Sequence, residues 1–388
     1  MNPRPQSLAV AASEDAPRCE DSVVVGTDST SYEVVSRIQA LAYERVVPLN
    51  VSMELTLNCN IRCLHCYNFD RDEAPTAAVA AGACGVDKPE LSLAERLELL
   101  EQLRASGALF LGLTGGEVLT YPHLFTVLDR ARELNFAVQL LSNGTMLQPG
   151  VAGRLAGYRN LMGVSISIYG ATPEVHDGIT QIPGSWRRTW EGVRRLRRLG
   201  IAVRLKFIIM GPNAHEVAQM RAAADGEGFG YSLDMTITPR HDASRGSLAM
   251  RMTGAQVGEL YRGPLRDLMP KGDRQISDDG FACNCARGNC AISAYGDVYP
   301  CISVPWSAGN VREQRFDDIW RTSPVFQRIR GLRITDYEAC APCTDKPFCN
   351  RNRGAAFNYS GSYTGIDPFV CETAAIARTI ATESQPSD

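Results

Sequence analysis

This sequence has no long hydrophobic run and no secretory signal, and its net charge is small. No apolar run reaches the roughly 18 residues of a membrane-spanning helix, so no membrane partner is expected. The formal net charge is −3 over 388 residues, which gives no general attraction to a phosphate backbone and argues against a nucleic-acid partner. The N-terminal residues lack a basic stretch followed by an apolar block. We therefore expect a cytoplasmic chain that begins with a disordered tail over residues 1–45.

Cysteine, in contrast, is abundant and unevenly placed. Of the 13 cysteines, Cys59, Cys63 and Cys66 lie in one short stretch, and eight others lie between residues 283 and 371. An odd total in a chain without a secretory signal argues against a disulfide framework. The distribution favours metal ligation in a reducing compartment.

Short apolar runs alternate with helical patterns between residues 46 and 237. The runs that predict strands are 51–57, 109–113, 136–141, 162–168, 201–210 and 231–237. Helical spacing predicts helices at 92–106, after Pro122, at 185–199 and near 213–224. The alternation predicts a parallel sheet, because parallel neighbours need a crossover connection. Six units are fewer than the eight of a closed barrel, so the predicted fold class is α/β, a partial (β/α)6 TIM-type barrel.

Three polar segments follow the first three predicted strands. They are "CNIRCLHC" (59–66), "TGGE" (114–117) and "SNGT" (142–145). Ligands of parallel sheets gather at the carboxyl ends of the strands, so we expect these segments to meet at one rim. The Ala- and Gly-rich segment 70–90 is expected to be a mobile surface loop near that rim. The arginine-rich helix at 185–199 is expected to have a solvated face, with a docking patch for an acidic peptide as the alternative.

Three thiols in one loop suit a cubane iron–sulfur cluster, because each iron of the cluster needs a ligand and three cysteines leave one iron open. The alternative is a zinc knuckle completed by His65. A structural zinc site needs four protein ligands, and the adjacent His65 and Cys66 would have difficulty reaching one ion.

The spacing C-x-x-x-C-x-x-C after the first strand, with Gly-Gly-Glu after the second, resembles the radical S-adenosylmethionine (radical SAM) enzymes over residues 50–237. The resemblance implies that Cys59, Cys63 and Cys66 bind a [4Fe–4S] cluster whose open iron is chelated by SAM. It also implies that one electron cleaves SAM to methionine and a 5′-deoxyadenosyl radical, which abstracts hydrogen from a substrate. An external electron donor such as a flavodoxin or ferredoxin is then required.

Further SAM contacts follow from the same resemblance. Gly115 and Gly116 would let the backbone approach the methionine moiety, and Glu117 would accept from its ammonium group. The other expected contacts, at the strand ends and beside the last cysteine of the loop, are Ser142, Asn143, Ser167 and His65. Lys206 is a substrate candidate if it points inward, and an outward, solvated lysine is the alternative. Two departures from the family pattern are Tyr169 and Thr180, where relatives often have Asp and Arg.

The C-terminal cysteines are similar to the SPASM extension of radical SAM proteins, over about residues 281–375. The resemblance implies one auxiliary iron–sulfur cluster on four cysteines and part of a second on three others: Cys340, Cys343, Cys349 and Cys371; and Cys285, Cys290 and Cys301. Arg353 stands where the family has the fourth ligand of the second cluster. That cluster then either has an open iron or uses Cys283. Two structural zinc ribbons are the alternative.

The remaining segments complete the expected organisation: a bridge over residues 238–280, a packing helix in 316–326 whose Trp320 and Phe326 belong to the core, and a tail over 376–388. The SPASM resemblance implies modification of a ribosomally made peptide by cross-linking, thioether formation, epimerisation or oxidation. The stretches before Cys59 and after Cys371 are too short for a winged-helix domain, so a separate leader-recognition protein is a possible partner.

Three other functions stay open at this point. One is a radical SAM enzyme that acts on a small molecule in cofactor or natural-product synthesis. Another is an anaerobic sulfatase maturase, which usually has Asp after the G-x4-C cysteine, where this chain has Ile302. The last is a non-catalytic iron–sulfur electron carrier or zinc scaffold, in which the Gly-Gly-Glu segment and Ser167 would have no task.

Overall fold

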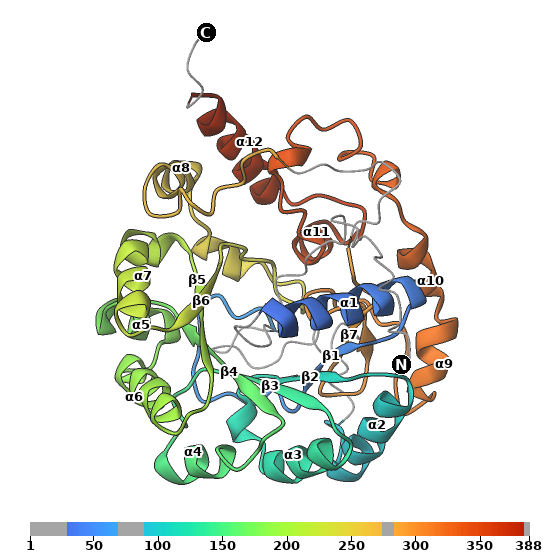
Figure 1. Ribbon diagram of the computed structural model, residues 1–388. Helices are drawn as coiled ribbons and strands as arrows, with labels where there is room; N and C mark the ends of the chain where they lie inside the picture. The colour runs from blue at the N-terminus through green and yellow to red at the C-terminus, as the bar shows by residue number, and fades with distance from the viewer. Residues whose placement is uncertain (1–28, 69–88, 274–282, 384–388) are drawn as a thin grey trace, which may run out of the picture.

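The computed structural model describes residues 29–68, 89–273 and 283–383, and its centre is an eight-stranded sheet of order β6-β5-β4-β3-β2-β1-β7-β8 (Figure 1). The strands are β1 (Asn50–Glu54), β2 (Phe110–Thr114), β3 (Ala137–Ser142), β4 (Leu161–Ile168), β5 (Val203–Ile208), β6 (Gly230–Asp234), β7 (Asn289–Ile292) and β8 (Val298–Tyr299). All neighbours pair in parallel except β7 and β8. In the described residues β6 and β8 form two separate edges, so the predicted partial barrel is confirmed.

Helices follow the barrel strands in the predicted alternation and lie along the outside of the sheet in Figure 1. They are α2 (Leu93–Ala105), α3 (Leu124–Glu133), α4 (Pro149–Leu155), α5 (Pro173–Thr180), α6 (Ser185–Arg198) and α7 (Val217–Gly226). A capping box starts α2: the Ser92 hydroxyl accepts from the Glu95 amide, and the Glu95 carboxylate accepts from the Ser92 amide. The helices α4 and α5, of 7 and 8 residues, were not predicted, because such short segments show little periodicity.

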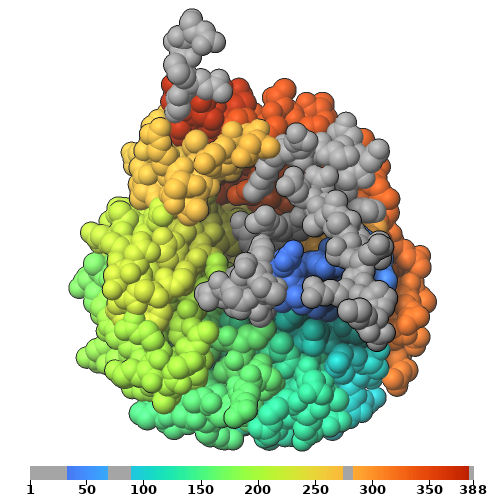
Figure 2. Space-filling model, in the orientation of Figure 1, coloured from blue at the N-terminus to red at the C-terminus, as the bar shows by residue number. Residues whose placement is uncertain are grey.

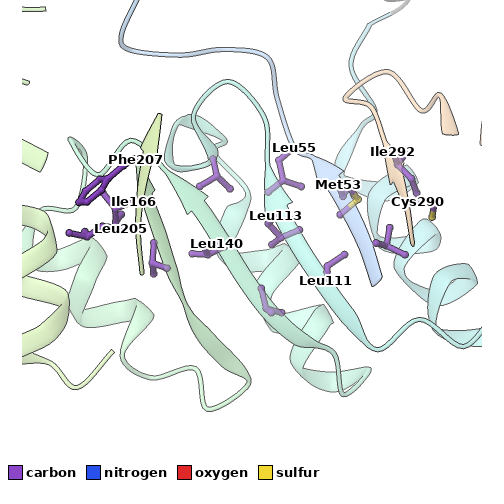
Figure 3. Close-up of a cluster of buried hydrophobic side chains, with 14 of the residues drawn as sticks. Met53, Leu55, Leu111, Leu113, Leu140, Ile166, Leu205, Phe207, Cys290 and Ile292 are labelled. Atoms are coloured by element: carbon purple, nitrogen blue, oxygen red, sulfur yellow. The ribbon is translucent and has the colours of Figure 1, made fainter. Parts of the chain in front are cut away.

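The two faces of the sheet differ in polarity. Toward the helices the strands present a continuous apolar layer that includes Met53, Leu111 and Leu205 (Figure 3). Because side chains alternate along a strand, the residues between them face the barrel interior. Those interior positions are mostly small or polar, as at Ser52, Gly112, Gln139, Ser165, Ser167 and Lys206. The helices therefore cover the core face, while the opposite face is chemically suited to ligands.

Residues 29–45 form a helix, α1 (Ser29–Arg45), which corrects the expectation of a tail over this segment. Its Val35, Ile38 and Ala42 pack in a cluster with Phe110 and other residues at the starts of strands, so burial stabilises the helix. Figure 1 shows α1 crossing the sheet, and Figure 2 shows its blue atoms at the centre of the same face. Residues 1–28, and all but the end of the predicted loop 70–90, lie outside the described residues.

The C-terminal region is joined to the barrel by its own strands, since β7 extends the sheet beside β1. The bridge contains α8 (Gly254–Arg262). The helices of the C-terminal region are α9 (Phe316–Thr322), α10 (Pro324–Gly331), α11 (Arg353–Ser360) and α12 (Pro368–Glu383). The 3-10 helices of the chain are η2 (Val118–Thr120), η3 (Gly211–Glu216), η4 (Gly246–Met250), η5 (Ile334–Asp336) and η6 (Lys346–Phe348). Trp320 and Phe326 are buried, as predicted. The expected tail from residue 376 is corrected up to residue 383, because α12 packs against α8.

Ion pairs fasten this region to the rest of the chain. Arg251 of the bridge pairs in a bidentate manner with Asp367, whose side chain is 0% exposed. Arg312 pairs with Glu95 of α2 (Nε to Oε1, 2.6 Å) and donates to the Pro89 carbonyl (2.9 Å). The C-terminal region is thus held at fixed positions against the barrel. Within the described ranges, none of the helices combines the length and apolar character that crossing a bilayer requires.

Candidate active site and thiol groups

The cysteine loop, residues 59–66, is held by main-chain hydrogen bonds from several elements. The amides of Arg62 and Leu64 donate to the carbonyls of Thr180 (2.9 Å) and Ile179 (3.1 Å) at the end of α5. Within the loop, the Cys66 amide donates to the Cys63 carbonyl (3.0 Å). The loop leaves the sheet at the carboxyl end of β1, so its three thiols lie at the predicted rim.

The Gly-Gly-Glu segment lies directly against the chain that leads into this loop. The Gly116 amide donates to the Thr56 carbonyl (2.7 Å), and the Glu117 amide donates to the Asn58 carbonyl (2.8 Å). A Cβ on Gly115 would lie 2.1 Å from the Thr56 carbonyl oxygen, and one on Gly116 would lie 2.3 Å from that of Asn58. Glycine is therefore required here by the approach of two protein backbones, in addition to any approach to SAM.

The Glu117 carboxylate connects the second and third rim segments. It is 1% exposed and accepts from the Ser142 hydroxyl (2.7 Å), the Asn143 amide (2.7 Å) and the Leu119 amide (3.1 Å). Burial raises the pKa of Glu117, and these hydrogen bonds oppose the rise. Oε1 accepts two of the bonds and Oε2 one, so Oε2 keeps acceptor capacity for a ligand ammonium.

Asn143 connects the third rim segment to the cysteine loop. Its Nδ2 donates to Asn60 Oδ1 (2.9 Å) and lies 3.9 Å from Cys59 Sγ. Asn60 in turn donates to the Thr145 hydroxyl (2.8 Å), which donates to Asn143 Oδ1 (2.6 Å). The sequence offers no signal for Asn60 and Thr145 beyond their places in the loops, because the bonds of Asn60 to Asn143 and Thr145 join residues more than 80 positions apart.

His65 and Tyr169 form the buried wall beside the loop. Their rings lie edge to face with the ring centres 4.7 Å apart, and His65 Nδ1 is buried without a hydrogen-bond partner. Burial, with a smaller contribution from His176, lowers the pKa of His65 to about 4, so the ring is neutral at pH 7. The Tyr169 hydroxyl contacts Cys63 and Ser167. The family departure at Tyr169 therefore places a phenol between the cysteine loop and β4.

Ser167 and Lys206 are register partners on β4 and β5, so their side chains share one face of the sheet. Lys206 lies between Leu205 and Phe207, both 0% exposed in the apolar layer. By alternation Lys206 is directed to the polar interior, in agreement with the inward alternative. Its contact with a substrate remains a prediction.

The segment after β6 also supports the cysteine loop, and no sequence pattern indicated it. The His241 amide donates to the Tyr67 carbonyl (2.7 Å), and Arg240 donates to the Leu64 carbonyl (3.3 Å). His241 Nε2 is buried without a partner, and burial lowers the pKa of His241 to about 4. These residues hold the far end of the cysteine loop, and only the fold reveals them.

The C-terminal cysteines separate into two thiol groups and one isolated residue. In the first group, which we call the proximal thiol group, the Cys285 side chain contacts those of Cys283 and Cys301. Cys290 is not part of it, and its inclusion among the ligands is corrected: it is 2% exposed in the apolar layer, beside Ile292 of β7 (Figure 3). The reason is strand alternation, which directs residues 290 and 292 toward the helices. Burial accordingly raises the pKa of Cys290.

The second group, the distal thiol group, contains the four predicted cysteines. Burial raises the pKa of Cys371 to about 11, and Cys349, Cys340 and Cys343 each raise it further through their nearby charges. Thiols from two separated stretches, residues 340–349 and α12, therefore lie close together.

The thiols fit iron–sulfur clusters. All 11 described cysteines are free, and in the described parts of the chain no three His, Cys, Asp or Glu side chains surround a single metal-ion position. A cubane cluster does not need such a position, because each thiolate binds a different iron. The buried, unpartnered nitrogens of His65 and His241 beside the loop are also suited to a ligand there.

Comparisons with known proteins agree with this chemistry. Residues 53–224 match the model of the radical SAM superfamily, and residues 283–344 match that of the SPASM iron–sulfur cluster-binding domain. The chain is 28% identical to an AdoMet-dependent heme synthase of Methanosarcina barkeri, over 83% of this chain and 96% of that protein. It is 27% identical to the mycofactocin maturase MftC of Mycobacterium tuberculosis, over 83% of this chain and 82% of the relative.

Solved structures share the fold. Streptococcus suis SuiB bound to S-adenosylmethionine matches with a TM-score of 0.60 at 13% identity, over 91% of this chain and 83% of that one. The AdoMet-bound structure of anSMEcpe matches with a TM-score of 0.64 at 13% identity, over 87% of this chain and 96% of that one. With three thiols, a Gly-Gly-Glu segment and two further thiol groups in place, the chain belongs to the radical SAM enzymes with a SPASM domain, whose cofactors are a SAM-binding [4Fe–4S] cluster and auxiliary iron–sulfur clusters.

Proposed function

We propose that this enzyme cleaves SAM reductively at the cysteine loop and modifies a ribosomally made peptide. The observation that carries the first part is the hydrogen-bond network in which Glu117, Ser142 and Asn143 meet the loop of Cys59. When bound, the cluster with SAM supplies one-electron cleavage of a sulfonium and a radical able to abstract hydrogen. An external electron donor of the flavodoxin or ferredoxin type, in a reducing compartment such as the cytoplasm, suits this chemistry.

The residues of the chain divide the work of binding between them. Cys59, Cys63 and Cys66 would hold the cluster, and Oε2 of Glu117 would accept from the SAM ammonium group. His65, neutral and buried, offers an apolar ring face to the adenine. Ser167 and the register partner Lys206 line the polar interior on the side of β4 and β5, where a substrate would lie.

A peptide substrate is favoured by relatives of two kinds. MftC is named a mycofactocin maturase, and AlbA of Bacillus subtilis, 26% identical over 78% of this chain, is named a subtilosin biosynthesis protein. The fold neighbour SuiB has been solved with its precursor peptide SuiA. We propose cross-linking, thioether formation, epimerisation or oxidation of a peptide side chain, with a separate leader-recognition protein as partner.

A small molecule in cofactor synthesis is the second candidate. The heme synthase of Methanosarcina barkeri is matched over 96% of its length, so this chain accounts for nearly the whole of a relative that acts in cofactor synthesis. The basic side chain of Lys206 in the polar interior would suit a carboxylate on either kind of substrate.

The test has two stages under anaerobic conditions. The reconstituted, reduced protein is incubated with SAM, and 5′-deoxyadenosine is measured by chromatography. Formation of 5′-deoxyadenosine is expected, and its absence would refute the proposal. The enzyme is then co-expressed with precursor peptides encoded beside its gene, and their masses are recorded. Unchanged peptides, together with turnover of a tetrapyrrole carboxylate, would favour the second candidate.

A further inference from the structure

Arg353 lies between the two C-terminal thiol groups. It is 7% exposed and close enough to both groups for its charge to act on them: it contributes to the lowered pKa of Cys283, and it opposes the rise that burial causes in the pKa of Cys349. One Nη donates to the Gly365 carbonyl (3.4 Å), while Nε is buried without a partner. A buried guanidinium donor without an acceptor is costly, so an acceptor is expected at this position.

Tyr337 also carries a buried hydrogen-bond donor without an acceptor. It is 2% exposed, and its hydroxyl is buried without a hydrogen-bond partner. The Arg353 guanidinium carbon lies 4.8 Å from the centre of its ring. Burial raises the pKa of Tyr337, with smaller contributions from charges on Cys283, Cys285 and Cys340. Two buried donors without acceptors, a phenol and a guanidinium, thus lie near the thiols.

The backbone fixes Arg353 beside the proximal group. A Cβ on Gly354 would lie 2.4 Å from the Ser303 Cβ, so the start of α11 contacts the chain just after Cys301. Asn358 of α11 also donates to the Ser303 carbonyl (2.9 Å). The Tyr363 hydroxyl lies 3.4 Å from Cys283 Sγ.

We propose that the proximal cluster is bound by Cys283, Cys285 and Cys301 alone, with Arg353 in place of a fourth thiolate and one iron open to an anionic ligand from outside. The guanidinium of Arg353 and the hydroxyl of Tyr337 donate to the cluster and its ligand. Because both are donors and one is a cation, the open iron favours a thiolate or carboxylate over a neutral amine. This assignment rests on the cofactors of the proposed function but does not depend on SAM cleavage.

The ligand set is tested in the variant C59A/C63A/C66A, which removes the SAM-binding site and leaves both C-terminal groups. Two matched further substitutions, Cys283→Ala and Cys290→Ala, are each made in this variant. After anaerobic reconstitution, iron and sulfide are measured and Mössbauer spectra are recorded. The first is expected to lose the iron of one cluster, and the second to retain all of it. Loss with Cys290→Ala, or full retention with Cys283→Ala, would overturn the ligand set.

The open iron is tested in the same triple variant by adding β-mercaptoethanol to the reduced protein and recording electron paramagnetic resonance spectra. A saturable change of the cluster signal is expected, and Arg353→Cys should abolish it by supplying the fourth thiolate. No change in the triple variant, or an undiminished change with Arg353→Cys, would refute the open site.

Arg353→Met is a second variant that keeps the proposal testable if Arg353→Cys does not fold. It should keep the thiolate response but lower the midpoint potential of the proximal cluster, because a positive charge near the cluster favours the reduced state. An unchanged potential would contradict contact with Arg353. These iron analyses and spectra use a variant that lacks Cys59, Cys63 and Cys66 and therefore cannot cleave SAM. Failure of the proposed function and failure of this assignment are thus distinguishable.

Discussion

The cysteine loop near the N-terminus and the thiol groups of the C-terminal region differ in how the chain brings them together. In the loop, one stretch of eight residues supplies all three thiols, and main-chain bonds from α5 and the segment after β6 hold it. The C-terminal thiol groups come from the segments before β7 and after β8, the stretch 340–349 and α12, and meet only through tertiary contacts. A local motif therefore specifies its own ligands, whereas dispersed ligands depend on packing. The predictions below test this difference.

The largest effect is expected from single cysteine substitutions in the two regions. Cys63→Ser should abolish 5′-deoxyadenosine formation while the iron of the C-terminal clusters is retained, because a two-thiolate loop cannot hold the SAM-binding cluster. Cys349→Ser should remove the iron of the distal cluster. The rate of SAM cleavage without substrate should stay within about tenfold of the wild type, because the residues that hold the cysteine loop lie outside the distal group. Anaerobic iron analysis and chromatography measure both. Loss of SAM cleavage in Cys349→Ser would show that the regions are not independent.

Arg251→Ala should destabilise the C-terminal region by about 3–5 kcal/mol, because it leaves the buried carboxylate of Asp367 without its cation. The control is Arg312→Ala, whose partner Glu95 is 36% exposed in its side chain, so a loss of about 1 kcal/mol or less is expected. Urea unfolding followed by circular dichroism measures both. Equal losses would contradict the dependence of this region on the buried pair.

Glu117→Gln should weaken SAM binding or slow its cleavage by about 10–100-fold, the range for residues that orient a metal-site ligand. An amide cannot accept from both the Ser142 hydroxyl and the Asn143 amide as the carboxylate does. Equilibrium dialysis with SAM and single-turnover cleavage measure the effect. Glu133→Gln, which changes an exposed carboxylate of α3, is the control and should behave as the wild type.

Acid should destabilise the barrel before the C-terminal region, because all five histidines precede residue 242. Burial lowers the pKa values of His65, His176 and His241 to about 4 from an ordinary value of 6.5. Below pH 6.5 the unfolded chain binds more protons, so stability present above that pH is lost as pH falls toward 4. About 1 kcal/mol per buried histidine is expected to be lost by pH 5.5.

Urea midpoints between pH 7.5 and 5.5 measure this loss. His241→Phe, which keeps a ring beside Tyr67, should give a shallower fall with pH. An identical slope in the variant would show that the pKa of His241 does not differ between the folded and unfolded protein, against the expected lowering.

Sequence patterns predicted most reliably those features that are encoded by residues close together in the chain. The six strands, the capped helix α2 and the three rim segments follow from periodicity and from the rule that ligands gather at the carboxyl ends of parallel strands. The helix α1 was missed because its stability comes from packing on Phe110 and Leu49, which local composition does not report. The role of Arg240 and His241 was missed for the same reason.

Cysteine spacing by itself determined that this chain holds three loop thiols and a cysteine-rich C-terminal region, and so the class of cofactor. It did not determine which thiols act together. Only the tertiary structure decided that Cys290 faces the apolar layer, that Cys283 joins Cys285 and Cys301, and that Arg353 lies between the thiol groups. The physical reason is that strand alternation and helix packing set the direction of a side chain, and direction decides whether a thiol can reach a cluster.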